Sequence, residues 1–326
     1  MKKQTFFIAT LWALWATCLH AQELIPYRKG DKWGFCTPDK KIVITPKYDN
    51  AWHFYEGFAL VELNGKWGLI DKTGNEIVPT RYDIVGVFHE GLARVKLNRK
   101  WGFIDKNGKL IVPPMYDEAW LFQEGLVRVE LNGKVGFIDK IGKEIVTSKY
   151  DDAKDFYEGL APVILNDKWG FIDKTGNIIV PPWYDDAFSF HEGLARVKLN
   201  GKWGFIDKTG KEIVTPKYDD AFSFHEGLAR VKLNDKWGFI DKTGKVIVPP
   251  WYDDVFGFHE GLAPVELNGK WGFIDKTGKE IVPPKYDYAL YLKPYFQEGL
   301  ARVILNEKEF YIKVFPDGKV VEYYEK

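Results

Sequence analysis

The dipeptide Trp-Gly returns every 34 residues through most of this 326-residue chain. It occurs at Trp33, Trp67, Trp101, Trp169, Trp203, Trp237 and Trp271, and the same register passes through Val135. A fixed period of this length indicates one small unit built many times. It also argues against an enzyme, because the motifs are repeated whereas a catalytic site usually needs one asymmetric cluster of residues.

One repeat shows what each unit is expected to form. Trp203–Asp207 is a short apolar and aromatic run that is typical of a strand. Asp207–Gly210 has the residues of a type I turn, with Asp first and Gly last. Glu212–Val214 then predicts a returning strand, which Pro216 is expected to end because proline cannot donate to a β-ladder. The glycine of Trp-Gly is expected to allow a close approach of a neighbouring backbone or ring.

The second half of the repeat predicts a loop and a third strand. Residues 218–227 are expected to form an ordered loop pinned by Tyr218 and Phe224. Leu228–Leu233 alternates apolar and charged residues, which is the period of a half-buried strand. Asn-Gly follows this strand in several copies, for example at Asn200, and is a strong hairpin signal. Each unit is therefore predicted to be a three-stranded antiparallel meander plus one loop.

The repeats together predict an all-β fold, in which tandem 34-residue β-meanders form an open, twisted, solenoid-like array. One such unit cannot bury its apolar face alone, so neighbours must stack. The alternative is a closed β-propeller, but its blades need about 40–45 residues. Both chain ends, residues 23–45 and 300–324, are divergent but complete units, as expected of caps. Residues 22–326 are predicted to be a single domain with eight full-length units, and four residues are inserted within 288–297.

The N-terminus has the pattern of a secretory signal peptide, residues 1–21. A basic start, Met1–Lys3, precedes the apolar run Thr5–Leu19, and Ala21 is suited to cleavage. An uncleaved anchor would need about 20 apolar residues, and a lipoprotein cleaved before Cys18 would have a bulky Trp in its lipidation box. We therefore expect export to the periplasm, the cell surface or the medium, with no membrane span after cleavage. Cys36 then stands alone and is expected to be buried.

Several spaced motifs recur together: Lys-Trp-Gly-Phe-Ile-Asp-Lys-Thr-Gly, Ile-Val-Pro-Pro-x-Tyr-Asp and Phe-x-Glu-Gly-Leu-Ala-Arg-Val. This pattern resembles the bacterial WG-repeat (KWG repeat) family over residues 32 to about 313. The resemblance implies a β-rich repeat module, often exported, with a binding or scaffolding role. It brings no catalytic residues. The chain departs from the pattern at Val135, at Lys154 and in the two terminal units.

The charges and polar motifs favour neither nucleic acid nor a cofactor. The 46 basic side chains are balanced by 46 acidic ones, whereas nucleic-acid binding favours a basic excess. His89, His191, His225 and His259 precede Glu-Gly, but Tyr or Gln replaces them in other copies, so we expect no metal site. Signatures of hydrolases, phosphate-binding loops and dinucleotide-binding folds are missing from the sequence. The carboxylates of Glu-Gly and Tyr-Asp are expected to cap backbone N–H groups in turns.

The positions that vary between repeats are the candidates for ligand binding. One lies four residues after the Tyr of Tyr-Asp, and the other lies directly before that Tyr. They supply the candidate residues Trp52, Trp120, Phe188, Phe222 and Phe256 from the first position, and Trp183 and Trp251 from the second. Repeated exposed aromatics on one face would make a binding surface; the alternative is packing between repeats. The row of Arg94, Arg128, Arg196, Arg230 and Arg302, with acids nearby, is expected to be a solvated, self-paired strand face.

Two functions follow from these observations. The first is an exported, non-enzymatic repeat scaffold that binds a protein partner or a surface component over an extended face. The alternative is a glycan- or cell-wall-binding module in which Trp52, Trp120, Trp183 and Trp251 stack on sugar rings. An enzyme is not expected.

Overall fold

The computed structural model describes residues 23–291, 300–315 and 319–323. Within them the regular structure is entirely β, arranged as nine antiparallel sheets in chain order, of which the first has three strands and the others have four. The chain divides into two compact units: one holds residues up to Gly86 together with 95–98 and 106–108, and the other holds the rest. The predicted signal peptide and most of the predicted insertion lie outside the described residues.

Apolar helices of membrane-spanning length do not occur in the described ranges.

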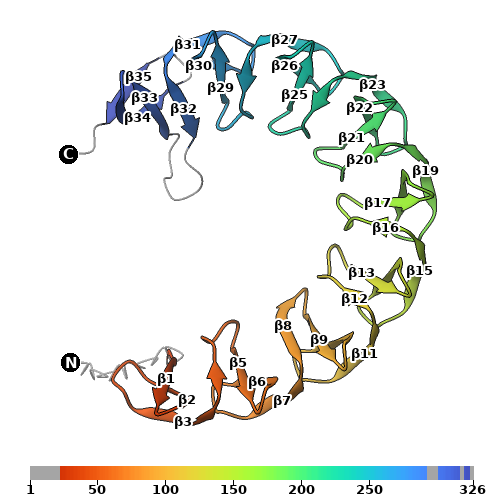
Figure 1. Ribbon diagram of the computed structural model, residues 1–326, viewed down its shortest axis with the longest axis vertical. Helices are drawn as coiled ribbons and strands as arrows, with labels where there is room; N and C mark the ends of the chain where they lie inside the picture. The colour runs from red at the N-terminus through yellow and green to blue at the C-terminus, as the bar shows by residue number, and fades with distance from the viewer. Residues whose placement is uncertain (1–22, 292–299, 316–318, 324–326) are drawn as a thin grey trace, which may run out of the picture. The chain divides into compact units, whose positions relative to one another are not determined.

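The sheet formed by β24 to β27 represents the repeated architecture (Figure 1). β24 (Asp220–Ala221) pairs with β25 (Leu228–Leu233), β25 with β26 (Lys236–Asp241), and β26 with β27 (Val246–Tyr252). The hairpin between β25 and β26 is tight, and both of its central residues, Asn234 and Asp235, have positive φ as a type I′ turn requires.

The other sheets repeat this order with these strand bounds. The three-stranded sheet contains β1 (Ile25–Lys29), β2 (Lys32–Cys36) and β3 (Ile42–Tyr48). The first strands are β4 (Asn50–Ala51), β8 (Ile84–His89), β12 (Glu118–Ala119), β16 (Asp152–Ala153), β20 (Asp186–Ala187), β28 (Asp254–Val255) and β32 (Tyr288–Tyr291). The second strands are β5 (Phe58–Leu63), β9 (Leu92–Leu97), β13 (Leu126–Leu131), β17 (Leu160–Leu165), β21 (Leu194–Leu199), β29 (Leu262–Leu267) and β33 (Leu300–Leu305). The third strands are β6 (Lys66–Asp71), β10 (Lys100–Asp105), β14 (Lys134–Asp139), β18 (Lys168–Asp173), β22 (Lys202–Asp207), β30 (Lys270–Asp275) and β34 (Lys308–Val314). The fourth strands are β7 (Glu76–Tyr82), β11 (Leu110–Tyr116), β15 (Glu144–Tyr150), β19 (Ile178–Tyr184), β23 (Glu212–Tyr218), β31 (Glu280–Tyr286) and β35 (Val320–Tyr323).

The open array of tandem β-meanders is confirmed. Each sheet, including the first and the last, is built from strands that are consecutive in the chain. A propeller that closed by sharing strands would combine both termini in one sheet, and the described residues contain no such sheet.

The predicted loop contributes a short fourth strand to the meander. In residues 218–227, Asp220 and Ala221 pair with Lys232 and Val231. The Phe222 N–H donates to the Arg230 carbonyl at 3.0 Å, and His225 forms an isolated bridge with Leu228. A strand of two residues is too short to show an alternating pattern, so periodicity could not reveal it.

The expectation that Pro216 ends its strand is wrong, because β23 continues through it to Tyr218. The pairing with β22 shifts between Trp203↔Tyr218 and Phe205↔Val214, which marks a β-bulge. The extra backbone of the bulge passes over Gly204, where an added Cβ would lie 2.4 Å from the Val214 carbonyl oxygen. The predicted close approach at this glycine is confirmed, and the bulge accommodates the proline without a lost ladder bond.

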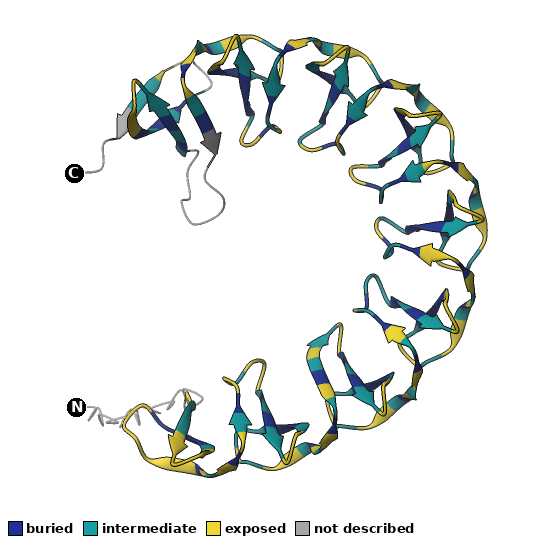
Figure 2. Cartoon of the chain, viewed as in Figure 1, coloured by how far each residue is buried: buried dark blue, intermediate teal, exposed yellow. Residues whose placement is uncertain are grey.

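The core lies between successive sheets, as stacking predicted (Figure 2). One cluster joins a face of the β24–β27 sheet to the opposite face of the next sheet, with a loop residue between them: Leu228, Phe239, Val248 and Tyr252 on one side, Val255, Ala263, Val265 and Ile274 on the other, and Phe258 in the loop. Complete burial of a Val, Leu, Ile or Phe side chain stabilises the fold by about 1.5–3 kcal/mol. Tyr218 and Phe224, which were predicted to pin the loop, are buried, as is Cys36.

The tryptophan of Trp-Gly lies near the margin of the core. Trp101, Trp203 and Trp271 are buried, whereas Trp33, Trp67, Trp169 and Trp237 are partly exposed. The deepest large side chains are instead the Phe of Trp-Gly-Phe and the Tyr of Tyr-Asp, for example Phe205 and Tyr218. Val135, which replaces Trp in one repeat, is buried in the same place.

Gly204→Ala should lower the thermal unfolding midpoint strongly, because its new Cβ has no room against the bulge backbone. Overpacking of this kind costs about 1–3 kcal/mol. Gly257→Ala is the matched control, since nothing lies within 4 Å of its added Cβ and its φ is not positive. Circular dichroism during heating measures both, and equal midpoints for the two variants would contradict the steric role of Gly204.

Candidate functional site

The Glu-Gly turns are linked from one repeat to the next. The Glu124 carboxylate accepts the N–H of Glu158 at 2.7 Å and that of Gly159 at 3.0 Å. It also pairs with Lys174 Nζ at 2.9 Å, and Lys174 belongs to the Asp-Lys-Thr-Gly turn. The same lysine pairing occurs along the array, as Glu56–Lys106, Glu90–Lys140, Glu158–Lys208, Glu192–Lys242 and Glu226–Lys276. The predicted capping role is confirmed, but the capped turn belongs to the following repeat.

The Tyr-Asp carboxylates form a second link between repeats. Asp151 pairs with Lys134 Nζ at 2.5 Å and accepts the N–H of Asn166, in the next hairpin, at 2.8 Å. The hydrogen bonds from Lys134 and Asn166 lower the pKa of Asp151. Asp117 and Asp253 are held in the same way by Lys100 and Lys236 and by the N–H groups of later hairpins. The Tyr-Asp carboxylates of the described repeats, and the Glu-Gly carboxylates from Glu56 to Glu226, are therefore occupied by the fold.

Arg302 shows the self-paired arrangement that the sequence suggested, because it pairs with the Glu309 carboxylate at 2.5 Å and 2.7 Å. Arg196 and Arg230 of the same row do not lie on a solvated face. Arg196 lies in β21, and its guanidinium carbon is 3.6 Å from the centroid of Phe188 and 5.5 Å from that of Phe222. The guanidinium carbon of Arg230 also lies close to this ring, 3.6 Å from the centroid of Phe222. Burial lowers the pKa of both arginines from the ordinary value. Arg196 is therefore stacked between aromatic rings of successive repeats and Arg230 is stacked on Phe222, because the ring faces attract the cations.

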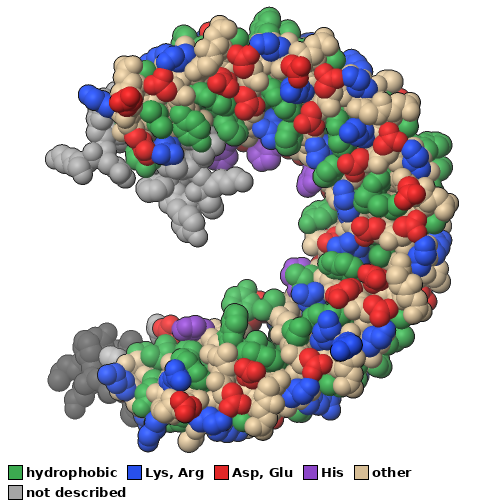
Figure 3. Space-filling model, viewed as in Figure 1, with side chains coloured by type: hydrophobic (Ala, Val, Ile, Leu, Met, Phe, Trp, Pro, Cys, Tyr) green, Lys and Arg blue, Asp and Glu red, His purple; other side chains and the backbone are tan. Residues whose placement is uncertain are grey.

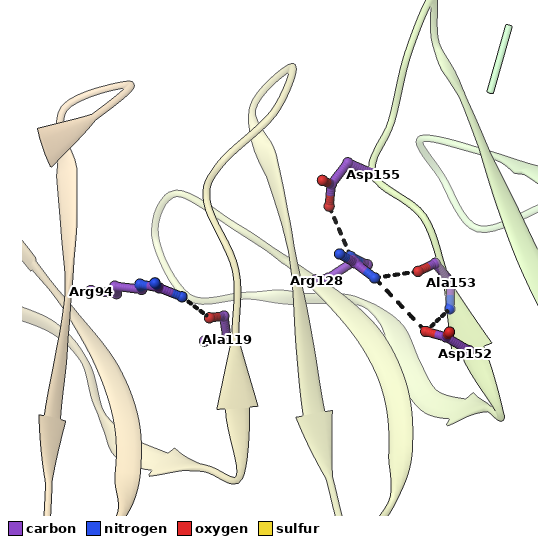
Figure 4. Close-up of polar contacts among 6 residues, drawn as sticks. All are labelled: Arg94, Ala119, Arg128, Asp152, Ala153 and Asp155. Carbon is purple, nitrogen blue, oxygen red and sulfur yellow. Dashed lines mark hydrogen bonds and ion pairs between the residues drawn. The ribbon is translucent and has the colours of Figure 1, made fainter. Parts of the chain in front are cut away.

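The arginines also hold the next sheet through its first strand. Arg94 Nη1 donates to the Ala119 carbonyl at 2.8 Å, and Arg230 Nη1 donates to that of Val255 at 3.0 Å. Arg128 makes the same bond to Ala153, and its Nε also donates to the Asp155 carboxylate at 2.8 Å (Figure 4).

Lys154 replaces an arginine that its own repeat lacks. Pro162 stands at the arginine position of β17. Lys154 Nζ donates to the Ala187 carbonyl at 2.7 Å and lies 3.8 Å from the Phe188 centroid. The departure from the family pattern at Lys154 therefore preserves a contact between repeats.

The predicted aromatic candidates lie on two different edges of the sheets. Trp52, Trp120, Phe188, Phe222 and Phe256 follow the first strand of a sheet, at what we call the loop edge. Trp183 and Trp251 lie in the fourth strands β19 and β27, at what we call the fourth-strand edge. Three strand spacings, roughly 14 Å, separate the two edges within a sheet. The single aromatic face that was expected is therefore not formed.

Their exposure differs as well. Trp52, Trp183 and Trp251 are 61%, 52% and 55% exposed, and Phe222 is 37% exposed. Trp120, Phe188 and Phe256 are partly buried, and each packs against a core cluster. Trp183 and Trp251 rest edge-on against the rings of Tyr184 and Tyr252. The alternative of packing between repeats therefore describes Trp120, Phe188 and Phe256, which contact neighbouring cations or rings.

A cavity of about 330 Å³ opens at the loop edge of the second compact unit. Its walls include Arg196, Arg230, His191, His225, Phe222 and Ser223. Of these, sequence reasoning singled out only Phe222 as a ligand-binding candidate. The others lie in different motifs, and only the stacking of successive sheets brings them to one place.

Groups of three or more His, Cys, Asp or Glu side chains arranged to hold a metal do not occur in the described ranges. The surface of the second compact unit instead shows interspersed acidic and basic side chains (Figure 3).

Comparison with known proteins gives one family and several distant structural likenesses. The model of the WG containing repeat matches residues 33–67, 67–101, 101–134, 136–169, 169–203, 203–237, 237–271 and 271–308. No curated protein matches the chain. A eukaryotic initiation factor is 12% identical with a TM-score of 0.44, over 93% of this chain and 96% of that one. Virginiamycin B lyase from Staphylococcus aureus is 14% identical with a TM-score of 0.31, over 69% and 92%.

PorZ, a surface component of the type-IX secretion system of Porphyromonas gingivalis, is 9% identical with a TM-score of 0.30. That likeness covers 93% of this chain and 51% of the other. At these TM-scores none of the three informs the function of the chain.

Glu158→Gln tests the link between Glu-Gly turns. Burial alone would raise the pKa of Glu158, but bonds from Lys208 and Gly193 hold it below its ordinary value of 4.5. A lowered folded-state pKa stabilises the fold above about pH 4.5, and the stabilisation is lost as the pH falls through the folded-state pKa. The variant should therefore lose about 1 kcal/mol at pH 7 and match the parent chain near pH 2.

Thermal unfolding at both pH values measures this difference. Glu260→Gln is the matched control. Glu260 occupies the equivalent position in the Glu-Gly turn of a later repeat, but it pairs with no lysine among the described residues. If Glu158→Gln were destabilised relative to the parent chain by the same amount at both pH values, the charge of Glu158 would not be the cause of the lost stability.

Proposed function

The chain belongs to the WG containing repeat family, and we propose that it is a non-enzymatic scaffold that binds a protein partner along the loop edge of its sheets. One observation supports this proposal above the others. The recurring Tyr-Asp carboxylates, and the Glu-Gly carboxylates from Glu56 to Glu226, form links between repeats. Hydrophobic side chains that vary between repeats are instead exposed at the loop edge. In the second compact unit these are Val87, Leu121, Tyr157 and Phe222.

Exposed hydrophobic side chains on successive repeats favour an extended partner. Buried aromatic side chains supply much of the affinity of protein interfaces, and Tyr157 and Phe222 are suited to that role. In a repeat array each additional repeat adds contacts to the same partner, so affinity rises with the number of repeats. Export is part of the proposal, and its support is the signal-peptide pattern of residues 1–21.

A glycan-binding module is the second candidate, and it has its own observation. Trp183 and Trp251 are exposed by about half on the fourth-strand edge, where each indole is braced by the neighbouring tyrosine ring. A flat, exposed indole held in one orientation is the kind of platform on which a sugar ring stacks.

Two variants of residues 22–326 separate the candidates. One replaces Leu121, Tyr157 and Phe222 with Ser, and the other replaces Trp52, Trp120, Trp183 and Trp251 with Ala. Quantitative cross-linking to cell-envelope proteins should lose its principal product with the first variant and keep it with the second. The glycan module would instead be favoured if the parent chain and the first variant stayed bound to insoluble cell-wall polysaccharide and the tryptophan variant did not.

Deletion of residues 169–236 is the test of additivity. It removes two repeats and rejoins Lys168 to Trp237, so the register of the Lys-Trp-Gly motif is kept. We expect affinity for the cross-linked partner to fall at least about tenfold, measured by titration calorimetry. Unchanged affinity would contradict binding over an extended face.

A further inference from the structure

We propose that the cavity beside Arg196 and Arg230 receives a carboxylate side chain from an acidic segment of the protein partner. The starting observation is a difference between equivalent arginines. Arg128 Nε donates to the Asp155 carboxylate at 2.8 Å (Figure 4). Asp155 lies 27 residues after Arg128, and the residues at the same offset from Arg196 and Arg230 are Ser223 and Gly257.

The cations at the cavity therefore lack the carboxylate that Arg128 has. Arg196 and Arg230 form no ion pair within the described part of the chain, although each donates to a carbonyl of the next sheet. The Nε–H of Arg196 is buried without a hydrogen-bond partner. A buried donor of this kind lowers stability until an acceptor reaches it.

Nearby acids do not fill this role. Asp186 and Asp220 attract Arg196 only through longer-range electrostatics. Their carboxylates instead accept the N–H groups of Ala187 and Ala221, both at 2.8 Å. The cavity keeps a net positive lining, to which the imidazoles of His191 and His225 add further N–H donors.

The dimensions and walls of the cavity fit a Glu or Asp side chain. Its volume, about 330 Å³, is at the small end for ligand sites. Phe222, Phe224 and Phe258 supply apolar walls for a methylene stem, while the guanidinium groups match the two oxygens of a carboxylate. The exposed side chains of Tyr157, whose ring lies 5.9 Å from that of His191, and of Phe222 favour a protein over a sugar acid as the source of the carboxylate. An acidic peptide segment is therefore the occupant that the lining favours.

This inference rests on the proposed function for the identity of the partner as a protein, but the site can be tested separately. The probe is the peptide acetyl-Gly-Gly-Glu-Gly-Gly-amide, with its Gln counterpart as the uncharged control. Residues 22–326 are labelled with ¹⁵N-arginine, and the Nε–H signals of Arg196 and Arg230 are assigned with R196K and R230K. The Glu peptide should shift both signals with saturation, and the Gln peptide should not.

The chain itself offers the decisive variant. Ser223→Asp places a carboxylate at the position that Asp155 has in the earlier repeat, so it should weaken the Glu peptide at least about tenfold. Ser223→Asn has nearly the same shape without the charge and should keep the parent affinity within about twofold. Thermal unfolding of both variants verifies that they fold.

The outcomes are distinct. Equal shifts with the Gln peptide, or parent affinity in Ser223→Asp, would overturn the carboxylate site. A response to glucuronate but not to the Glu peptide would overturn the acidic segment as its occupant. If the Glu peptide does not bind, the loss of cross-linking on replacing Leu121, Tyr157 and Phe222 is still expected. If the cross-linking experiment finds no protein partner, the Glu peptide is still expected to bind.

Discussion

The structure depends on the fact that each small sheet has two apolar faces and can bury neither of them alone. In the second compact unit the core clusters are shared between neighbouring sheets, as between the β20–β23 and β24–β27 sheets and between the β24–β27 and β28–β31 sheets. Stability in such an array is set by the interfaces between repeats as much as by the repeats themselves. The recurring side chains are accordingly those that fill or bridge these interfaces.

The polar residues obey the same constraint. Glu124 is held in a left-handed conformation, with a φ of 52°, which a non-glycine residue adopts at some cost. Its carboxylate then bonds the equivalent turn of the next repeat and a lysine 50 residues further along the chain. Asp151 similarly joins Lys134 to the following hairpin. Their partners show that these recurring acidic residues stabilise the contacts between repeats.

In the proposed function, binding uses positions that vary between repeats. The exposed loop-edge residues Leu121, Tyr157 and Phe222 differ from one repeat to the next, which gives successive repeats different surfaces on the same scaffold. At the position of Asp155 the later repeat has Ser223, so Arg196 lacks the carboxylate that Asp155 gives Arg128. Variation at this one position thus decides whether an arginine of the preceding repeat has a carboxylate partner.

The sequence by itself determined the repeat length, the all-β class, the three main strands and the Asn-Gly hairpin. These features depend on residues close together in the chain, and their patterns recur in successive 34-residue repeats. It did not determine the two-residue strand at Asp220, the continuation of β23 through Pro216 or the partner of Glu124. Those depend on backbone and side chains of a neighbouring strand or repeat, which no local pattern encodes. Only the pairing of strands decided that Trp183 and Phe188 lie on different edges of their sheets. Only the stacking of sheets decided that Arg196, Arg230 and His191 line one cavity.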